Sequence, residues 1–324
     1  MSAKHPIIAF TGSSGAGTTT FRRVFDRLFK EEGITRFRVD GNAFRRYDRK
    51  AMKYQVQLAM EQGRCLSHFS PEANYLERLE SLFREYSRTG TGLCRRYAEN
   101  RELAEAYGVP EGSFTPWEEI PQGTDLLVYD GLHGGYSENP LSHRGKLPHN
   151  PRIAGQRRRL ANPEVPGLDV ARWVDLLIGV VPVINLEWIQ KIYRDAHHKN
   201  KETENTVQTI LRRLPDYIDY IVPQFSLTDI NFQRVPLSDS SNPFVLREIP
   251  SLDESIVVIR FRDPKGHDFP HYLKRIRGAW MSRRNTMVIP GGQLEHAIRV
   301  ICAPLVHRLV ERYRQAGDHP TARE

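Results

Sequence analysis

The chain alternates between short apolar runs and longer segments whose apolar residues recur every three or four positions. Short apolar runs bounded by polar residues are typical of buried strands, and the wider spacing is typical of helices that bury one face. The runs predict strands at Ile7–Phe10, Phe37–Val39, Leu126–Tyr129, Leu176–Val183, Ile218–Val222, Ile256–Phe261 and Met287–Ile289. The wider spacing predicts helices over residues 19–32, about 50–62, 72–87, 186–196, 203–214 and 293–314.

This order of elements predicts an α/β fold. Strands that alternate with helices form a mainly parallel sheet covered by helices. The later strands, between residues 218 and 261, are separated by loops, which favours an antiparallel extension there. With 324 residues, we predict a single domain over 1–324. A stretch rich in proline and arginine at about 137–167 is interpreted as a basic insertion, and the tail at about 316–324 as disordered.

The cysteine content, the apolar runs and the net charge limit the kinds of protein that the chain can be. The three cysteines lie far apart, which suggests neither a zinc site nor a disulfide framework and favours reduced thiols in the cytoplasm. We find no signal peptide and no apolar run long enough to cross a bilayer, so we expect no membrane contact. The net charge of +8 suits phosphorylated substrates or nucleic acid. The run Arg157–Arg159 could contact nucleic acid, but it lacks interleaved aromatic residues, so we consider nucleic acid the less favoured partner.

A glycine-rich loop joins the first predicted strand to the first predicted helix. Its residues are Gly12, Ser13, Ser14, Gly15, Ala16, Gly17, Thr18, Thr19 and Thr20. In this context such a P-loop wraps backbone N–H groups around an oligophosphate, and the helix adds the positive end of its dipole. Thr19 stands where a P-loop places the hydroxyl that binds Mg²⁺, whereas Thr18 stands where lysine is usual. We therefore predict that these residues bind a nucleoside triphosphate, despite the missing lysine.

Two further groups of residues could complete a phosphotransferase. Asp130 follows a buried strand and could hold the water shell of a metal ion, although turn residues also occupy such positions. Lys191, Arg194 and Asp195 project together from the predicted helix 186–196, with Lys199 and Arg213 nearby in sequence. These cations could neutralise the transferring phosphoryl group in place of the missing lysine. A solvated helix face with one salt bridge is the alternative.

A basic segment follows the second predicted strand and begins with Asp40, Gly41 and Asn42. Arg45, Arg49 and Lys53 recur every four residues, which predicts a cationic helical stripe suited to a phosphorylated acceptor. An ordinary basic surface helix is the alternative.

Several stretches resemble the bacterial-type phosphoribulokinase family: residues 12–20, 67–74, 179–195, 223–236 and 241–244. The similarity around them covers nearly the whole chain apart from the insertion at about 137–167 and the tail. The resemblance implies a P-loop kinase fold like that of nucleoside-monophosphate kinases, with ATP and Mg²⁺. It also implies a homo-octamer that phosphorylates the 1-hydroxyl of ribulose 5-phosphate in the Calvin cycle. Threonine in place of the loop lysine is usual in this branch.

The resemblance also implies roles for individual residues. Lys191 and Arg194 would stabilise the transferring phosphoryl group, and Asp195 would serve the metal or the proton transfer. The metal would be held by Thr19, Asp130 and Asp195. The sugar phosphate would be bound by Arg45, Arg49, Lys53, Lys199 and Arg213.

The chain departs from the family pattern at the acceptor site. Asn42 replaces the aspartate expected as general base, Arg45 replaces a histidine and Lys199 an arginine. Asparagine cannot accept a proton at neutral pH. Three interpretations stay open: Asp40, Asp195 or the substrate takes the proton, the acceptor is another phosphorylated sugar or nucleoside, or the chain is a weakened nucleotide-binding regulator.

The effector site expected in the family is also altered. Family members are activated by NADH and inhibited by AMP. Arg260 and Arg283 match two arginines of the effector site, whereas Glu31 replaces the third. The reversed charge argues against activation by NADH.

Overall fold

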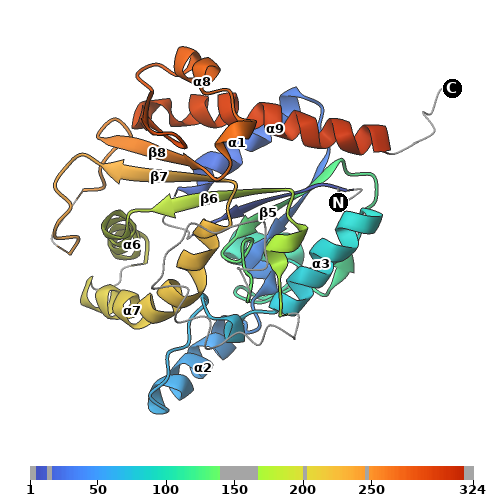
Figure 1. Ribbon diagram of the computed structural model, residues 1–324. Coiled ribbons are helices and arrows are strands. Elements are labelled where there is room, and N and C mark those ends of the chain that lie inside the picture. Colours follow the sequence, from blue (N-terminus) through green and yellow to red (C-terminus); the bar gives the residue numbers. More distant parts are fainter. Residues whose placement is uncertain (1–4, 13–16, 139–166, 200–202, 245–247, 317–324) are drawn as a thin grey trace. The chain divides into compact units, whose positions relative to one another are not determined.

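The computed structural model describes residues 5–12, 17–138, 167–199, 203–244 and 248–316 (Figure 1). The chain separates into two compact units, each assembled from segments that are distant in sequence. Unit 1 contains residues 1–11, 37–177 and 215–228. Unit 2 contains residues 12–36, 178–214 and 229–324.

Unit 1 is built around parallel strands. The strands β2 (Arg36–Asp40), β5 (Leu126–Gly131) and β1 (Ile7–Thr11) are neighbours in that order. β1 and β5 run parallel, with Phe10 opposite Asp130. The short strands β3 (Leu93–Cys94) and β4 (Glu118–Glu119) form a separate antiparallel pair. The helices of this unit are α2 (Arg49–Glu61), α3 (Leu76–Thr89), α4 (Arg101–Tyr107), η1 (Gly41–Phe44), η2 (Pro71–Ala73), η4 (Val170–Trp173), η5 (Tyr217–Ile221) and η6 (Val222–Ser226).

Helix α3 supplies much of the core of unit 1. Its apolar residues recur at helical spacing, so one face is buried: Leu76, Leu79, Leu82, Phe83 and Tyr86. Phe83 meets Tyr129 of β5 edge to face, with ring centroids 5.4 Å apart. The helix ends at Gly90, whose backbone is left-handed (φ 76°) and whose N–H donates to the carbonyl of Tyr86 in the last turn.

Unit 2 contains most of β6 (Leu176–Pro182) and the strands that follow it. The order is β6, β7 (Ile230–Pro236), β8 (Ser255–Phe261), β10 (Thr286–Pro290) and β9 (Trp280–Arg283). β6 and β7 are parallel, and the later pairs are antiparallel. The helices are α1 (Thr18–Glu31), α6 (Ile184–Lys199), most of α7 (Thr203–Asp216), α8 (Phe269–Arg275), α9 (Leu294–Ala316), η7 (Pro264–Gly266) and η8 (Gly291–Gln293).

Helices α1 and α9 pack against each other (Figure 1). Phe21 of α1 is buried against Phe232 of β7, with ring centroids 5.0 Å apart. Exposed ion pairs join the two helices, among them Arg23 with Glu295 and Glu31 with Arg299. The buried face of α1 therefore fixes the helix that follows the glycine-rich loop.

Most of the predicted elements are confirmed, and so is the antiparallel extension. The strand predicted at Ile218–Val222 is wrong, because residues 217–226 form η5 and η6. Tyr217 and Ile221 are buried one helical turn apart, whereas Ile218 is exposed. The apolar runs did not predict β7, in which polar residues alternate with apolar ones, or the exposed edge strand β9.

Two predictions about regions of the chain lie almost entirely outside the described residues. They concern the insertion at about 137–167 and the tail at about 316–324. The three cysteines are free thiols. In the part of the chain that the structure describes, we find no helix with the length and apolarity needed to span a membrane.

Candidate active site

Two glycines frame the described part of the glycine-rich loop. A Cβ atom at Gly12 would lie 2.4 Å from the carbonyl oxygen of Val180 in β6, so a larger residue would displace backbone. Gly17 adopts a left-handed conformation (φ 97°) just before α1, which favours glycine. Ser13, Ser14, Gly15 and Ala16 lie outside the described residues.

The first turn of α1 suits an anion. It carries Thr18, Thr19 and Thr20, and in this described turn no acidic residue occurs and no side chain caps the helix. The N–H groups of a first turn have no partner within the helix. Phosphate oxygens bind such groups well, because the helix dipole is positive at this end. Thr19 is exposed, so its hydroxyl can reach a ligand.

The cationic residues of α6 surround a buried carboxylate. Asp195 is only 2% exposed. Lys191 Nζ donates a hydrogen bond to Asp195 Oδ2 at 3.0 Å, and Arg194 Nε lies 4.0 Å from Asp195 Oδ1. The structure therefore confirms that these three residues project from one face of a helix.

Burial and the neighbouring charges shift the pKa of Lys191. Burial lowers the pKa of Lys191 below its ordinary value, while Asp195 favours the charged form and opposes this shift. Arg213 and Arg194 lower the pKa of Lys191 further by repulsion. Arg213 of α7 thus belongs to the same electrostatic cluster, whereas the side chain of Lys199 lies outside the described residues.

Buried apolar residues and a loop hold α6 in place. Leu186, Ile189 and Ile192 are buried, whereas Tyr193 is 37% exposed. Asn185 donates a hydrogen bond to the carbonyl of Ser240 at 3.0 Å.

The same loop contributes an aromatic contact to α6. Phe244 stacks on Trp188 with ring centroids 5.5 Å apart. Together with the hydrogen bond to Ser240, this stacking ties the loop 240–244 to α6, which the sequence alone did not indicate.

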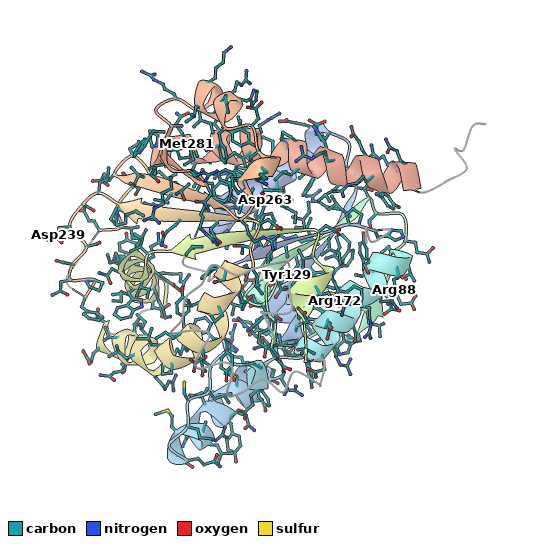
Figure 2. The ribbon with its side chains drawn as sticks, viewed as in Figure 1. Arg88, Tyr129, Arg172, Asp239, Asp263 and Met281 are labelled. Carbon is teal, nitrogen blue, oxygen red and sulfur yellow. The ribbon has the colours of Figure 1, made fainter. Side chains whose placement is uncertain are left out.

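The end of β2 in unit 1 carries the first of the residues predicted to contact the acceptor. Asp40 caps η1 by accepting the N–H of Asn42 at 2.8 Å. A Cβ atom at Gly41 would lie 2.8 Å from the Cα of Gly131, so the ends of β2 and β5 approach closely. Tyr129, labelled in Figure 2, is buried beside both glycines.

Two carboxylates lie at these strand ends. Asp130 is buried and accepts a hydrogen bond from Arg38 Nη2 at 3.2 Å. The Asp40 side chain reaches solvent. The protein atoms around Asp40 nevertheless exclude enough water to raise its pKa, and repulsion from Asp130 acts in the same direction.

The predicted cationic stripe is wrong in one respect. Helix α2 begins at Arg49, because Asp48 caps it, and Arg45 has extended backbone before the helix. The Arg45 guanidinium lies over the Tyr97 ring, 5.1 Å from its centroid. Arg49 Nη1 donates to Glu111 Oε1 at 2.7 Å, and Lys53 is exposed one turn further along α2.

The candidate effector arginines lie together in unit 2. Arg260 of β8 and Arg283 of β9 both stand opposite Thr286 of the intervening strand β10. Directly opposite residues of antiparallel strands share one face of a sheet. Glu31, which the resemblance places at the position of a third effector arginine, pairs with Arg299.

No group of three or more potential metal-ligating His, Cys, Asp or Glu side chains occurs among the described residues. The described residues predicted to bind ATP, together with Lys191, Arg194 and Asp195, belong to unit 2. Most residues predicted for the acceptor side belong to unit 1: Asp40, Asn42, Arg45, Arg49 and Lys53. Lys199 and Arg213 belong to unit 2. Asp130 also belongs to unit 1.

Comparison with known proteins gives matches over nearly the whole chain. The sequence model of the phosphoribulokinase/uridine kinase family matches residues 7–147 and 161–241. The chromosomal phosphoribulokinase of Cupriavidus necator is 48% identical over 319 residues, covering 98% of this chain and 100% of the relative. Phosphoribulokinase 1 of Cereibacter sphaeroides is 46% identical over 317 residues, covering 98% and 100%. The solved structure of the Rhodobacter spheroides phosphoribulokinase superposes with a TM-score of 0.79 at 44% identity, covering 97% of this chain and 100% of that one.

Proposed function

The chain belongs to the phosphoribulokinase/uridine kinase family, and from that membership we propose that it is a phosphoribulokinase. The reaction transfers the γ-phosphoryl group of ATP to the 1-hydroxyl of D-ribulose 5-phosphate and gives ribulose 1,5-bisphosphate. The observation that carries this proposal is the identity of 48% to a phosphoribulokinase over the whole length of that relative. The bacterial-type resemblance and the P-loop kinase fold are thereby confirmed.

Unit 2 supplies the groups that would hold ATP. Gly17 and the first turn of α1 would present N–H groups to the phosphates. Lys191 and Arg194 would stabilise the negative charge on the transferring phosphoryl group, the task that the loop lysine performs in other P-loop enzymes. Asp195 would keep Lys191 protonated and oriented through their hydrogen bond.

We propose Thr19 and Asp195 of unit 2 as ligands of Mg²⁺, and Asp130 of unit 1 as a further candidate. A hydroxyl and carboxylates are the oxygen ligands that this ion prefers, and such sites commonly use one or two carboxylates together with substrate phosphates. When bound, Mg²⁺ would neutralise charge on the phosphate oxygens.

The sugar phosphate would be held by arginines and lysines. Arg49, Lys53 and Arg45 of unit 1 carry positive charge close in sequence, with Lys199 and Arg213 as the further candidates. Glu111 already holds the Arg49 guanidinium at 2.7 Å, so its orientation is set before the substrate arrives.

Asp40 is the group that we propose as general base in place of Asn42. Its carboxylate reaches solvent, is anchored to the Asn42 N–H and has a raised pKa, which strengthens it as a base. Asp195 is less suited, because it is buried and paired with Lys191.

The test of the function is direct. The purified protein, ATP, Mg²⁺ and ribulose 5-phosphate should yield ADP and ribulose 1,5-bisphosphate, identified by mass spectrometry and ³¹P NMR. Turnover with another phosphorylated sugar or nucleoside instead would identify a different acceptor. ATP binding without transfer to any of these compounds would leave only the nucleotide-binding regulator.

Two variants test the base. Asp40→Asn should lower kcat by about 10²- to 10⁴-fold if Asp40 takes the proton. Asn42→Asp should then leave kcat nearly unchanged. A large rise in kcat in Asn42→Asp, with little loss in Asp40→Asn, would mean that the general base is simply missing.

A further inference from the structure

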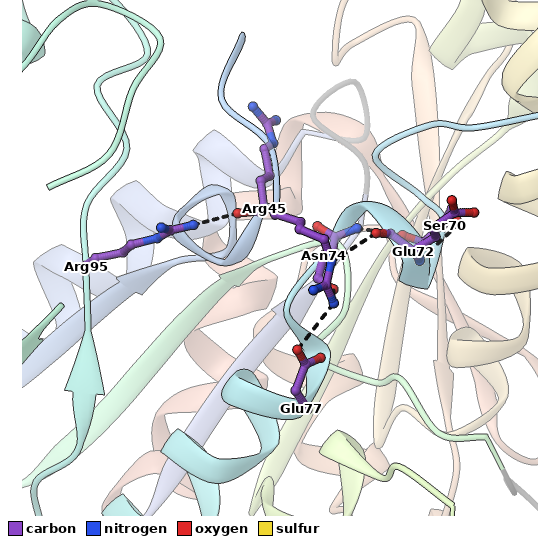
Figure 3. A network of polar contacts seen from close by, with 7 residues as sticks. Arg45, Ser70, Glu72, Asn74, Glu77 and Arg95 are labelled. Carbon is purple, nitrogen blue, oxygen red and sulfur yellow. Dashed lines mark hydrogen bonds and ion pairs between the residues drawn. The ribbon is translucent and has the colours of Figure 1, made fainter. Parts of the chain in front are cut away.

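The acceptor segment, residues 40–46, is held along one side by residues 67–75. The N–H of Arg46 donates to the carbonyl of Ala73 at 2.8 Å, and the N–H of Tyr75 donates to the carbonyl of Phe44 at 2.7 Å. Arg45 and Asn74 form an antiparallel bridge between these hydrogen bonds (Figure 3).

The supporting segment 67–75 is itself fixed by buried polar contacts. Ser67 Oγ donates to Asp216 Oδ2 at 2.7 Å, and both residues are buried. Asn74 Nδ2 donates to the carbonyl of Ser70 at 2.7 Å. His133 Nε2 lies 3.0 Å from the carbonyl of Phe69. The acceptor segment therefore rests against a rigid neighbour.

Arg95 holds the same segment through two further backbone groups. Its Nη2 donates to the carbonyl of Arg45 at 2.6 Å, as Figure 3 shows. Its Nε donates to the carbonyl of Ala43 at 2.8 Å. The last carbonyls of a short helix such as η1 have no partner within the helix. One planar guanidinium satisfies two carbonyls at this helix end.

Aromatic rings fix the guanidinium of Arg95 from its faces. Its central carbon lies 3.7 Å from the centroid of the Phe114 ring and 4.6 Å from that of Trp117. Burial lowers the pKa of Arg95 to about 10, so the side chain stays charged at neutral pH.

We propose that Arg95 is a positioning residue of the acceptor site. By bridging the carbonyls of Ala43 and Arg45 it fixes the backbone that presents Asn42 and the Arg45 side chain to the acceptor. This inference rests on the proposed function, because the acceptor is the molecule that residues 40–46 receive. Lysine could not replace Arg95, since an ammonium group lacks the rigid fork that spans two carbonyls.

The test compares Arg95→Lys with Arg96→Lys, a matched control. Arg96 is the next residue, and the central carbon of its guanidinium lies 5.2 Å from the centroid of the Tyr107 ring. Arg95→Lys should raise the KM for ribulose 5-phosphate about tenfold, the effect of losing one charged hydrogen bond, and leave the KM for ATP unchanged. Arg96→Lys should change neither constant. An unchanged acceptor KM in Arg95→Lys, or an equal rise in both constants, would overturn the proposal.

Hydrogen exchange provides a measurement that needs no substrate. The amides of residues 42–46 should exchange faster in Arg95→Lys than in the unmodified chain or in Arg96→Lys, and unchanged protection would also overturn the proposal. If Arg95→Lys does not fold, Phe114→Leu removes one ring that fixes the guanidinium and should give smaller changes in the same direction. Lack of transfer by the unmodified chain would instead refute the proposed function, and the exchange result would still decide the role of Arg95.

Discussion

His133 makes the stability of unit 1 depend on pH. The side chain is 3% exposed, and its Nε2 lies 3.0 Å from the carbonyl of Phe69, which a neutral imidazole can satisfy by donating. Burial lowers the pKa of His133 to about 4, and repulsion from Arg45 acts in the same direction. The hydrogen bond to Phe69 only partly opposes these two effects.

The magnitude follows from linkage between protonation and folding. The unfolded chain protonates His133 below its ordinary pKa of 6.5, whereas the folded chain resists protonation until about pH 4. The unfolded state therefore binds more protons in this window, and stability rises with pH. The contribution is fully present above pH 6.5 and is lost as the pH falls towards 4. The gap between these pKa values is worth at most about 3.4 kcal/mol, and about 1.4 kcal/mol is lost at roughly pH 5.5.

The measurement is urea unfolding of the unmodified chain and of His133→Gln at about pH 8 and pH 5.5. Glutamine keeps an N–H donor for the Phe69 carbonyl but does not titrate. We expect the unmodified chain to lose about 1.4 kcal/mol more than the variant between these pH values, at one protein concentration. Equal losses in the two proteins would refute the reasoning.

Further predictions concern the proposed ATP site and the response to NADH. Gly12→Ala should lower kcat/KM for ATP on the order of a hundredfold, because its Cβ would displace the loop from β6. Asp195→Asn should lower kcat and shift the alkaline limb of the kcat–pH profile to lower pH, because Asp195 holds the pKa of Lys191 up; an unshifted limb would contradict this. NADH should leave the rate unchanged, because Glu31 pairs with Arg299, and activation in steady-state assays would contradict this role of Glu31.

Sequence patterns predicted those parts of the site whose chemistry is local in the chain. The spacing of Lys191, Arg194 and Asp195 predicted that they project together, because residues three and four apart on a helix are neighbours, and Lys191 pairs with Asp195 in the structure. The spacing of Arg45 and Arg49 misled for the same reason, since Asp48 starts the helix between them. The spacing of the basic residues does not indicate where a capping residue such as Asp48 starts the helix.

The role that we propose for Arg95 could not be predicted from sequence. Arg95 contacts residues about 50 positions away in the sequence. The sequence around Arg95 does not indicate which carbonyls its guanidinium will bind. The same holds for the stacking of Phe244 on Trp188, which depends on where a distant loop returns to α6. Such contacts are set by tertiary structure alone.

The contacts of the acceptor segment bear on the meaning of Asn42 and Arg45. Ordering a segment costs roughly 1–2 kcal/mol of backbone entropy per residue, and the contacts that residues 40–46 make with Arg95 and with the segment 67–75 help to offset that cost. A protein that merely bound nucleotide would need no such fixed surface in unit 1. The departures at Asn42 and Arg45 change the side chains that this backbone presents, while the backbone itself stays firmly held. This combination favours an enzyme with altered acceptor contacts over a regulator that has lost its acceptor site.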